Sequence, residues 1–198
     1  MSQRIVILTG GIGSGKSVVA AILEGRSIPV YDTDSRAKDV YNTVPSVIDD
    51  LEKAFGMSLR LEDGQPDRKA LASAIFSSEE RRRKMESIVY PLLYKGFLNW
   101  KEDYPLEPFV VLESAIILSK LEYFPFEEET VVVLVKASRE VRIRRAMERD
   151  SCTREEVLAR IEAQEEIPES MADIVIDNSG SLQDLVSEVS RVFFPKNC

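Results

Sequence analysis

The chain of 198 residues is 44% hydrophobic, which suits one α/β domain with lobes or at most two small domains. It has no apolar run long enough to span a bilayer and no signal-peptide pattern, and its net charge of −8 argues against extended nucleic-acid binding. The absence of histidine excludes His-based triads and His metal sites, and two distant cysteines, Cys152 and Cys198, favour a reducing, cytoplasmic setting.

A glycine-rich loop joins the first predicted strand, residues 5–8, to the first predicted helix, residues 17–23. The segment Gly10–Ser17 fits the phosphate-binding pattern G-x-x-x-x-G-K-[ST] in full. Glycines let backbone N–H groups turn towards a phosphate, and the helix N-terminus presents its positive dipole end. The pattern therefore predicts a nucleotide-phosphate site, with Lys16 on the β- and γ-phosphates and the Ser17 hydroxyl on Mg²⁺.

The second predicted strand, residues 28–34, ends in a pair of acidic residues. Asp32 and Asp34 are two positions apart, and on an extended segment such side chains point the same way. Beside a phosphate site, the two carboxylates can hold Mg²⁺ or accept a proton from an attacking hydroxyl group. The alternative role for Asp34 is the N-cap of the next helix, because aspartate is a favoured capping residue.

Helices are predicted through the middle of the chain. Residues 35–56 are expected to be helical apart from an interruption at Pro45, and Asp67 is a candidate N-cap. A long helix follows, and its basic run at residues 81–84 favours a solvated surface because adjacent charges distribute around a helix, with contact to a substrate phosphate as the alternative. Since residues 57–108 show no clear core strand, we expect a helical insertion that covers the substrate.

Three further strands are predicted, and an amphipathic helix over residues 182–193 follows the last of them. The segments are 109–118, a strand that runs into a loop or helix, and the strands 130–137 and 172–180. Five short strands that alternate with helices indicate a doubly wound parallel sheet, in which ligands bind at the C-terminal ends of the strands. Besides the glycine loop, those ends carry Asp32, Asp34, Glu113, Ser138, Arg139, Asp177 and Asn178.

The helical stretch 139–167 carries an arginine-rich face. Arg142, Arg145 and Arg149 stand at i, i+3 and i+7, and Arg139 lies one turn earlier on the same side. Guanidinium groups bind phosphates through two parallel hydrogen bonds, so this face is suited to close over the phosphate loop. The alternative is a solvated face in which neighbouring glutamates balance the arginines.

Several motifs together resemble the dephospho-CoA kinase family, and they span nearly the whole chain. They are LTGGIGSGKS, the D-x-D of VYDTD, DGQPDRKALASAIF, ESIVYP, the R-x-x-x-R-D of RAMERD, RIEAQ and ADIVIDNSG. Many families share the phosphate loop alone, whereas its combination with the other motifs is much more specific. The resemblance implies ATP-dependent phosphorylation of the ribose 3′-hydroxyl of dephospho-CoA, which gives CoA and ADP in the last step of CoA biosynthesis.

The resemblance also implies a fold and an organisation. We expect an α/β protein with a doubly wound five-stranded parallel sheet of the P-loop kinase type, a helical substrate-binding insertion and a helical lid. The implied single domain over 1–198 divides into a core (1–34, 109–138 and 168–198), an acceptor (CoA)-binding region (35–108) and a lid (139–167). ATP and dephospho-CoA are the implied small-molecule substrates and Mg²⁺ the implied metal, while neither nucleic acid nor a membrane is expected.

Residue roles follow from matching positions of the family motifs. The implied catalytic residues are Asp34, Lys16, Arg145 and Arg149. Asp34 is the implied base near the ribose hydroxyl, and the two arginines clamp the phosphates as charge moves. The ATP phosphates are assigned to Gly11, Ile12, Gly13, Ser14, Gly15, Lys16 and Ser17. The adenine side is assigned to Asn178, and the metal to Ser17 and Asp32.

Two places depart from the family pattern, and both are expected to contact the acceptor. Tyr90-Pro91 stands where the family usually has His-Pro, and ESAIILS, from Glu113 to Ser119, stands where the family commonly has PLLFE. The nearest rival function is another small-metabolite or nucleoside-monophosphate kinase. A P-loop regulatory switch is a rival of a different class, although it needs no arginine-lined lid and the guanine-reading N-K-x-D pattern is absent.

Overall fold

The computed structural model describes residues 3–164 and 166–195, so Cys198 lies outside the described residues. The chain divides into two compact units. We call Met1–Asp32, Tyr104–Ser119 and Phe126–Cys198 the sheet unit, and Thr33–Asp103 with Lys120–Pro125 the helical unit. Within the described ranges, no helix combines the length and the hydrophobicity that crossing a membrane requires.

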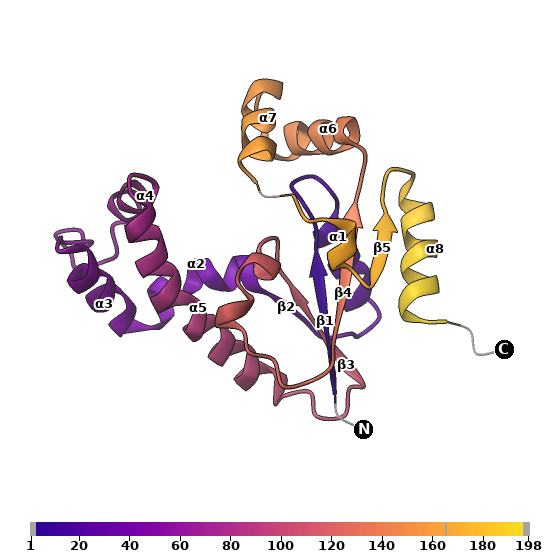
Figure 1. Ribbon diagram of the computed structural model, residues 1–198, viewed down its shortest axis with the longest axis horizontal. Helices are drawn as coiled ribbons and strands as arrows, with labels where there is room; N and C mark the ends of the chain where they lie inside the picture. The colour runs from indigo at the N-terminus through magenta and orange to yellow at the C-terminus, as the bar shows by residue number, and fades with distance from the viewer. Residues whose placement is uncertain (1–2, 165, 196–198) are drawn as a thin grey trace. The chain divides into compact units, whose positions relative to one another are not determined.

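Five parallel strands form the sheet in the order β2-β3-β1-β4-β5, which confirms the predicted doubly wound sheet (Figure 1). The strands are β1 (Arg4–Thr9), β2 (Val30–Asp32), β3 (Phe109–Glu113), β4 (Thr130–Lys136) and β5 (Ile174–Asp177). The side chains of β1 are buried from Ile5 to Thr9, as the run of aliphatic residues predicts for a parallel strand. Because β1 is central, the loop that follows it lies at the middle of the C-terminal sheet edge.

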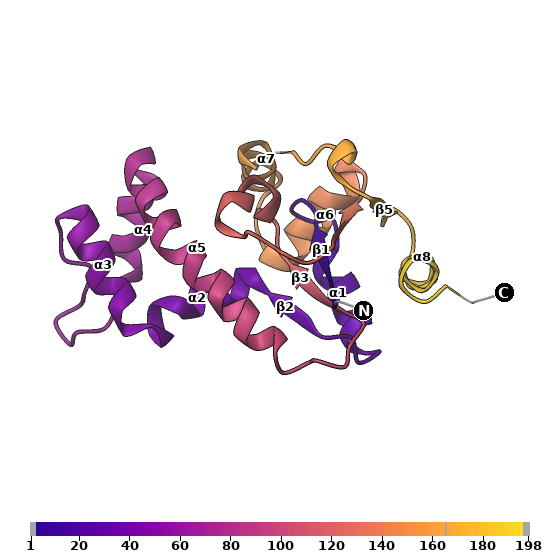
Figure 2. The same ribbon diagram turned by 60° about the horizontal axis from the view of Figure 1, so that its bottom comes forward.

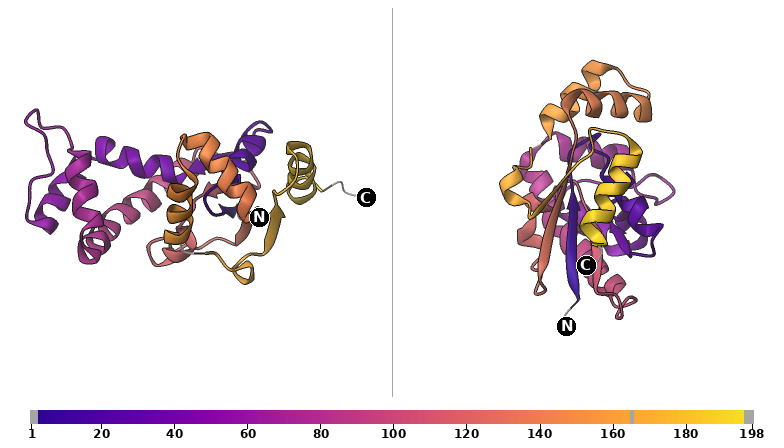
Figure 3. Two further views of the ribbon diagram at one scale, coloured as in Figure 1. Left: turned by 90° about the horizontal axis from the view of Figure 1, so that it is seen from above. Right: turned by 90° about the vertical axis from the view of Figure 1, so that its right-hand side faces the viewer.

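Two helices cover one face of this sheet. α1 (Lys16–Glu24) and α8 (Leu182–Phe193) pack on it, and α8 lies beside β5 (Figure 3). The shared core consists of Val6, Leu8, Val19, Ala20, Leu23, Val111, Val133, Val135, Ile176, Leu185 and Val189. Burying apolar surface stabilises the fold by roughly 25 cal/mol per Å². This core fixes the start of α1 against the end of β1, and therefore fixes both ends of the glycine loop.

The predicted lid segment, residues 139–167, contains two helices, α6 (Arg139–Asp150) and α7 (Arg154–Ala163). Ser151, the C-cap residue of α6, is left-handed with a φ of 51°. Thr153, the N-cap residue of α7, forms a capping box. The two helices pack on each other through a small core of Ile143, Ala146 and Val157. Two short 3₁₀ helices of the sheet unit are η1 (Ile117–Ser119) and η3 (Glu169–Met171).

In the helical unit, shorter helices pack on one long helix (Figure 2). The elements are α2 (Thr33–Thr43), α3 (Pro45–Phe55), α4 (Arg68–Phe76), α5 (Glu79–Lys101) and the 3₁₀ helix η2 (Leu121–Tyr123). Each of the others contacts α5. Pro45 begins α3, and the Asp67 carboxylate caps α4 by accepting hydrogen bonds from two backbone N–H groups. The predicted interruption at Pro45 and the predicted cap at Asp67 are therefore confirmed.

Several boundaries differ from the sequence prediction, since β3 and β5 are shorter than the predicted segments 109–118 and 172–180. β2 ends at Asp32 and α2 begins at Thr33, so the predicted strand over residues 28–34 is too long. Asp34 lies inside the first turn of α2, and neither the alternation of an extended segment nor the N-cap role applies to it. Residues 120–125 belong to the helical unit, although residues of the sheet unit flank them in sequence.

Candidate active site

The phosphate loop, Gly10–Ser17, connects β1 to α1 in the sheet unit. Gly15, directly before α1, is left-handed with a φ of 92°, and a side chain there would collide with the Asn178 amide. Gly13 has a φ of 74°, and the backbone of Arg142 lies against its Cα. These glycines are therefore needed for the loop conformation and also for the close approach of β5 and the lid.

Lys16 forms a buried ion pair with Glu113. The Nζ atom of Lys16 lies 2.7 Å from Oε1 of Glu113, and only 11% and 6% of the two side chains are exposed. Glu113 ends β3 and is in register with Leu8 of β1, so neighbouring strands bring the carboxylate to the base of the loop. The sequence predicted Glu113 at this sheet edge, within a segment expected to contact the acceptor, but it did not predict the pairing with Lys16. A phosphate in the loop competes with this carboxylate for the Lys16 ammonium group.

Asn178 ties the end of β5 to both the loop and the lid. It is only 3% exposed, and its Nδ2 donates a hydrogen bond to the backbone oxygen of Ser14 at 2.8 Å. Arg145 of α6 donates to the Asn178 backbone oxygen at 2.8 Å and to Oδ1 at 3.4 Å. Two residues that the resemblance assigned to nucleotide binding, Asn178 and Arg145, are thus in direct contact beside the loop.

The arginines of α6 divide into two groups. Arg142 and Arg145 contact the loop and Asn178, whereas Arg149 is 60% exposed at its side chain and pairs with Asp150 through Nε and Oδ1 at 2.7 Å. The hydrogen bonds from Arg149, and next from Arg160, hold the pKa of the Asp150 carboxyl group well below its usual range. Arg149 therefore lies in an exposed ion-pair network, as the solvated alternative predicted for the whole face.

Ile12, near the tip of the loop, is bound by two residues of the lid. Its N–H donates to Oε1 of Gln164 at 2.8 Å, and its carbonyl oxygen accepts from Nε of Arg142 at 2.8 Å. The sequence analysis placed Arg142 on the arginine face, and Gln164 only within the RIEAQ motif. Gln164 and Arg142 lie 152 and 130 positions after Ile12 in the sequence, and no local pattern predicts contacts over such separations.

The oxygen donors assigned to Mg²⁺ lie on the sheet unit. Ser17 is in the first turn of α1, and Asp32 ends β2 in register with Glu113 of β3. Among the described residues, no group of three or more acidic or cysteine side chains forms a metal cluster. Mg²⁺ keeps several waters and takes phosphate oxygens from a nucleotide, so a small set of hard oxygen donors fits this metal.

A hollow of about 90 Å³ lies in the sheet unit between the segment after β3 and the segment that follows α7. Its lining comprises Ala115, Ile116, Leu118, Ser119, Gln164, Glu166, Ile167, Pro168 and Met171. Most of the segment ESAIILS, where the chain departs from the family pattern, therefore lines a cavity that also includes Gln164.

Tyr90 lies in an aromatic cluster of the helical unit. It is 8% exposed, and its ring packs against Tyr123 and Phe124 with centroid distances of 5.4 and 6.1 Å. Burial, and next the charge of Glu86, raises the pKa of the Tyr90 hydroxyl group well above its usual range. Tyr90 is therefore a neutral, largely buried packing residue at ordinary pH.

Substituting Tyr90 with phenylalanine is expected to leave kcat and KM for the acceptor within about threefold of wild type, because the ring contacts remain. Steady-state kinetics with the acceptor as the varied substrate measures both constants. Tyr90→Ala serves as the comparison, since it removes the ring and opens a cavity. A loss of several hundredfold in the phenylalanine variant would instead assign a chemical role to the hydroxyl group.

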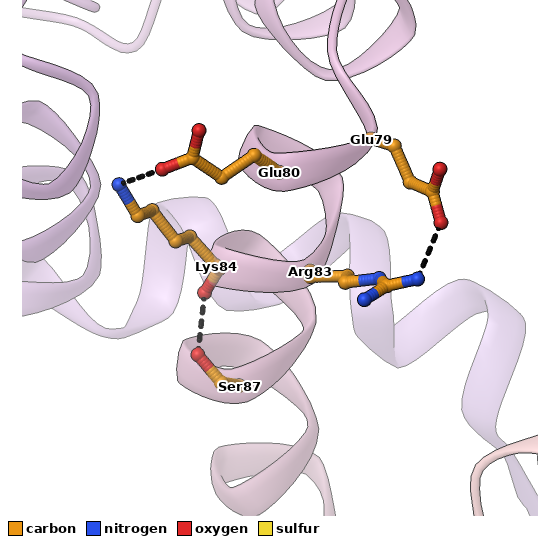
Figure 4. A pocket seen from close by; sticks show the side chains of 5 residues that line it. All are labelled: Glu79, Glu80, Arg83, Lys84 and Ser87. Carbon is orange, nitrogen blue, oxygen red and sulfur yellow. Dashed lines mark hydrogen bonds and ion pairs between the residues drawn. The ribbon is translucent and has the colours of Figure 1, made fainter.

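The basic run 81–84 lies on the first turns of α5, where a surface hollow has charged walls (Figure 4). Arg83 pairs with Glu79 at 2.6 Å and Lys84 with Glu80 at 2.7 Å, both at i,i+4 spacing. Such exposed pairs contribute little to stability, because water and salt screen the charges. The two pairs agree with the predicted solvated surface.

Comparisons with known proteins point to one family. The family model described as Dephospho-CoA kinase matches residues 4–184. The dephospho-CoA kinase of Oceanobacillus iheyensis is 34% identical over 193 residues, with 95% of each chain covered. The crystal structure of TT1252 from Thermus thermophilus is 34% identical with a TM-score of 0.79 over all of both chains. That of the dephospho-CoA kinase from Campylobacter jejuni, 21% identical, shares the fold with a TM-score of 0.63 over 98% of this chain and 96% of the other. The chain therefore belongs to the dephospho-CoA kinase family.

Proposed function

We propose that the sheet unit binds ATP and that the helical unit binds dephospho-CoA, whose ribose 3′-hydroxyl receives the γ-phosphoryl group. Family membership makes the chain a kinase that phosphorylates dephospho-CoA with ATP in CoA biosynthesis. In this reaction the bond between the γ-phosphorus and the ADP oxygen breaks, a bond to the ribose oxygen forms, and the hydroxyl proton passes to a base. The observation that carries the proposal is the glycine loop with Lys16 at the centre of the sheet edge, contacted by Asn178, directly after β5, and by residues of the lid.

On the ATP side, we assign the phosphates to Gly11–Ser17 and the adenine side to Asn178. The backbone N–H groups of the loop and the N-terminus of α1 favour negative charge. Lys16 exchanges its pairing with Glu113 for the β- and γ-phosphates and stabilises charge as it moves to the leaving oxygen. Arg145, which lies against Asn178, adds a second cation beside the loop.

On the acceptor side, we assign the role of base to Asp34 in the first turn of α2. A ribose hydroxyl is a poor nucleophile at neutral pH, so a carboxylate that orients it and takes its proton speeds the transfer. Asp32 and Ser17 are assigned to Mg²⁺, which when bound neutralises charge on the phosphate oxygens. We assign acceptor binding to residues 35–108 and the role of a lid to residues 139–167.

A cytoplasmic setting is part of the proposal. Cys152 carries a free thiol, which fits a reducing compartment. The substrates proposed are small molecules, ATP and dephospho-CoA.

An acceptor panel tests the proposed function. The enzyme is incubated with ATP and Mg²⁺ and with dephospho-CoA, AMP, shikimate or no acceptor, and ADP release and product mass are measured. We expect ADP and CoA to form together only with dephospho-CoA. Comparable kcat/KM for AMP or shikimate would identify a rival kinase. Nucleotide binding without turnover on any acceptor would favour a regulatory switch.

Substituting Arg149 with lysine is expected to lower kcat about tenfold while KM for ATP changes less than threefold. Lysine keeps the charge but loses the planar fork, and Arg149 now uses that fork on Asp150. The role proposed for Arg149 therefore requires the fork to leave Asp150 and reach the phosphates as charge moves. Kinetics at varied ATP measures the two constants. An unchanged kcat with weaker ATP binding would mean that Arg149 contributes only to the binding of ATP in the ground state.

A further inference from the structure

Three contacts of different kinds hold Ile12 on the lid. The two backbone hydrogen bonds, to Gln164 and from Arg142, are both 2.8 Å long. The Ile12 side chain packs against the small core that α6 and α7 share. One residue of the phosphate loop is thus fixed through its N–H, its carbonyl oxygen and its side chain by both helices of the lid.

The glycines beside Ile12 have the same explanation. A Cβ on Gly11 would lie 2.6 Å from Nη2 of Arg142 and 3.3 Å from Oε1 of Gln164, and one on Gly13 would collide with the Arg142 backbone. A side chain at position 13 would therefore displace the backbone of α6, and one at position 11 would displace the Arg142 guanidinium group from its place. The phosphate-loop pattern leaves positions 11 and 13 open to any residue, so the pattern itself does not account for these two glycines.

The chemistry of the two lid residues suits a lasting contact. Burial lowers the pKa of Arg142, which is the effect expected when a guanidinium group loses water and contacts a backbone carbonyl. Partly buried hydrogen bonds are exposed to less competition from water than surface ones. Gln164 is the C-cap residue of α7, so its side chain extends from the end of that helix.

Arg145 follows Arg142 by three positions on α6, on the same side of the helix. Arg142 contacts the loop at Ile12, and Arg145 contacts Asn178, which in turn contacts the loop at Ser14. Any rotation of α6 that breaks the first contact also moves the second. The position of Arg145 therefore depends on the hydrogen bonds that Arg142 and Gln164 form with Ile12.

We infer that Arg142 and Gln164 are positioning residues that grip the phosphate loop at Ile12 and so set the place of Arg145 in the transition state. This inference rests on the proposed kinase function. Since the two residues act through Ile12 and not on the substrate, their loss lowers kcat while ATP still binds. Because Arg142 and Gln164 both act on Ile12, the loss of either residue removes most of the contribution to kcat that the two make together.

The experiment compares Arg142→Met, Gln164→Leu and the double variant by steady-state kinetics with ATP and dephospho-CoA. We expect each single change to lower kcat about tenfold, as the loss of one partly buried hydrogen bond implies, with KM for ATP within about threefold. The double variant should lose much less than the product of the single losses. Arg142→Lys, which keeps one donor, should recover part of kcat.

Arg154→Met is the matched control. Arg154 is a lid arginine with a two-point ion pair to Glu140 and without a hydrogen bond to the loop among the described contacts. Its substitution should leave kcat unchanged. Each variant is also checked for its melting temperature, so that unfolding is separated from lost positioning.

Amide hydrogen exchange gives a readout that does not depend on turnover. In the nucleotide-free enzyme, the Ile12 N–H should exchange slowly, and Gln164→Leu should accelerate it at least about tenfold. Unchanged exchange, or independent effects of the two substitutions on kcat, would overturn the inference. If wild type itself fails to phosphorylate dephospho-CoA, the proposed function fails, whereas normal kcat in the variants of an active enzyme counts against the grip alone.

Discussion

Replacing Lys16 with alanine is expected to reduce the transfer of phosphate to dephospho-CoA by at least about a thousandfold, because the cation that stabilises the moving charge is lost. The change has a second effect. Glu113 is 6% exposed at its side chain and loses its partner at 2.7 Å. Removing one member of a buried pair destabilises a protein by about 3–5 kcal/mol. The single variant is therefore expected to melt at a lower temperature, as well as to be inactive.

The double variant Lys16→Ala with Glu113→Gln separates these effects. Glutamine has the size of glutamate without its charge, so the buried carboxylate is no longer left unpaired. We expect the melting temperature to recover most of its loss while turnover remains absent. Turnover within a few-fold of wild type in either folded variant would refute the assignment of the phosphate site.

Replacing Asp34 with asparagine is expected to lower kcat by about 10²–10⁴-fold, the usual contribution of a positioned general base. Asparagine preserves size and polarity but cannot take the proton of the ribose hydroxyl. ATP binding should remain, because the loop and Lys16 belong to other elements. We expect the kinetic assay to show this loss of kcat and calorimetry to show that ATP binding is retained.

Asp39→Asn is the control for this change. Asp39 is an exposed aspartate on the same helix, α2, so it tests the general effect of losing one carboxylate there. Its kcat should match that of wild type. Near-normal turnover in Asp34→Asn would move the base to Asp32 or Glu113, the carboxylates that end β2 and β3.

The sequence predicted the sheet because each strand has a local signal. Aliphatic runs such as residues 5–8 and 130–137 are too apolar for a surface, and the helical segments between them require parallel pairing. The glycine loop was equally readable, because its pattern is short and continuous. Local patterns of this kind can be recognised without knowledge of the rest of the chain.

Contacts between distant segments were not readable. Gln164 reaches Ile12 across 152 positions, and nothing near either residue predicts the pair. The strand-end position of Asp34 was wrong because a D-x-D segment reads equally well as a strand end or as a first helical turn. The arginine spacing placed Arg142, Arg145 and Arg149 on one face, but it could not show that Asp150 engages the last of them.

The central place of β1 in the sheet has a consequence for synthesis of the protein. β1 is translated before both of its partners in the sheet, β3, which starts at Phe109, and β4, which starts at Thr130. The emerging chain therefore carries an unpaired apolar strand until these partners have been made, which is when such segments aggregate or recruit chaperones. The phosphate loop is translated before the strands that hold its base rigid, so a chain halted before β4 cannot present a formed phosphate loop.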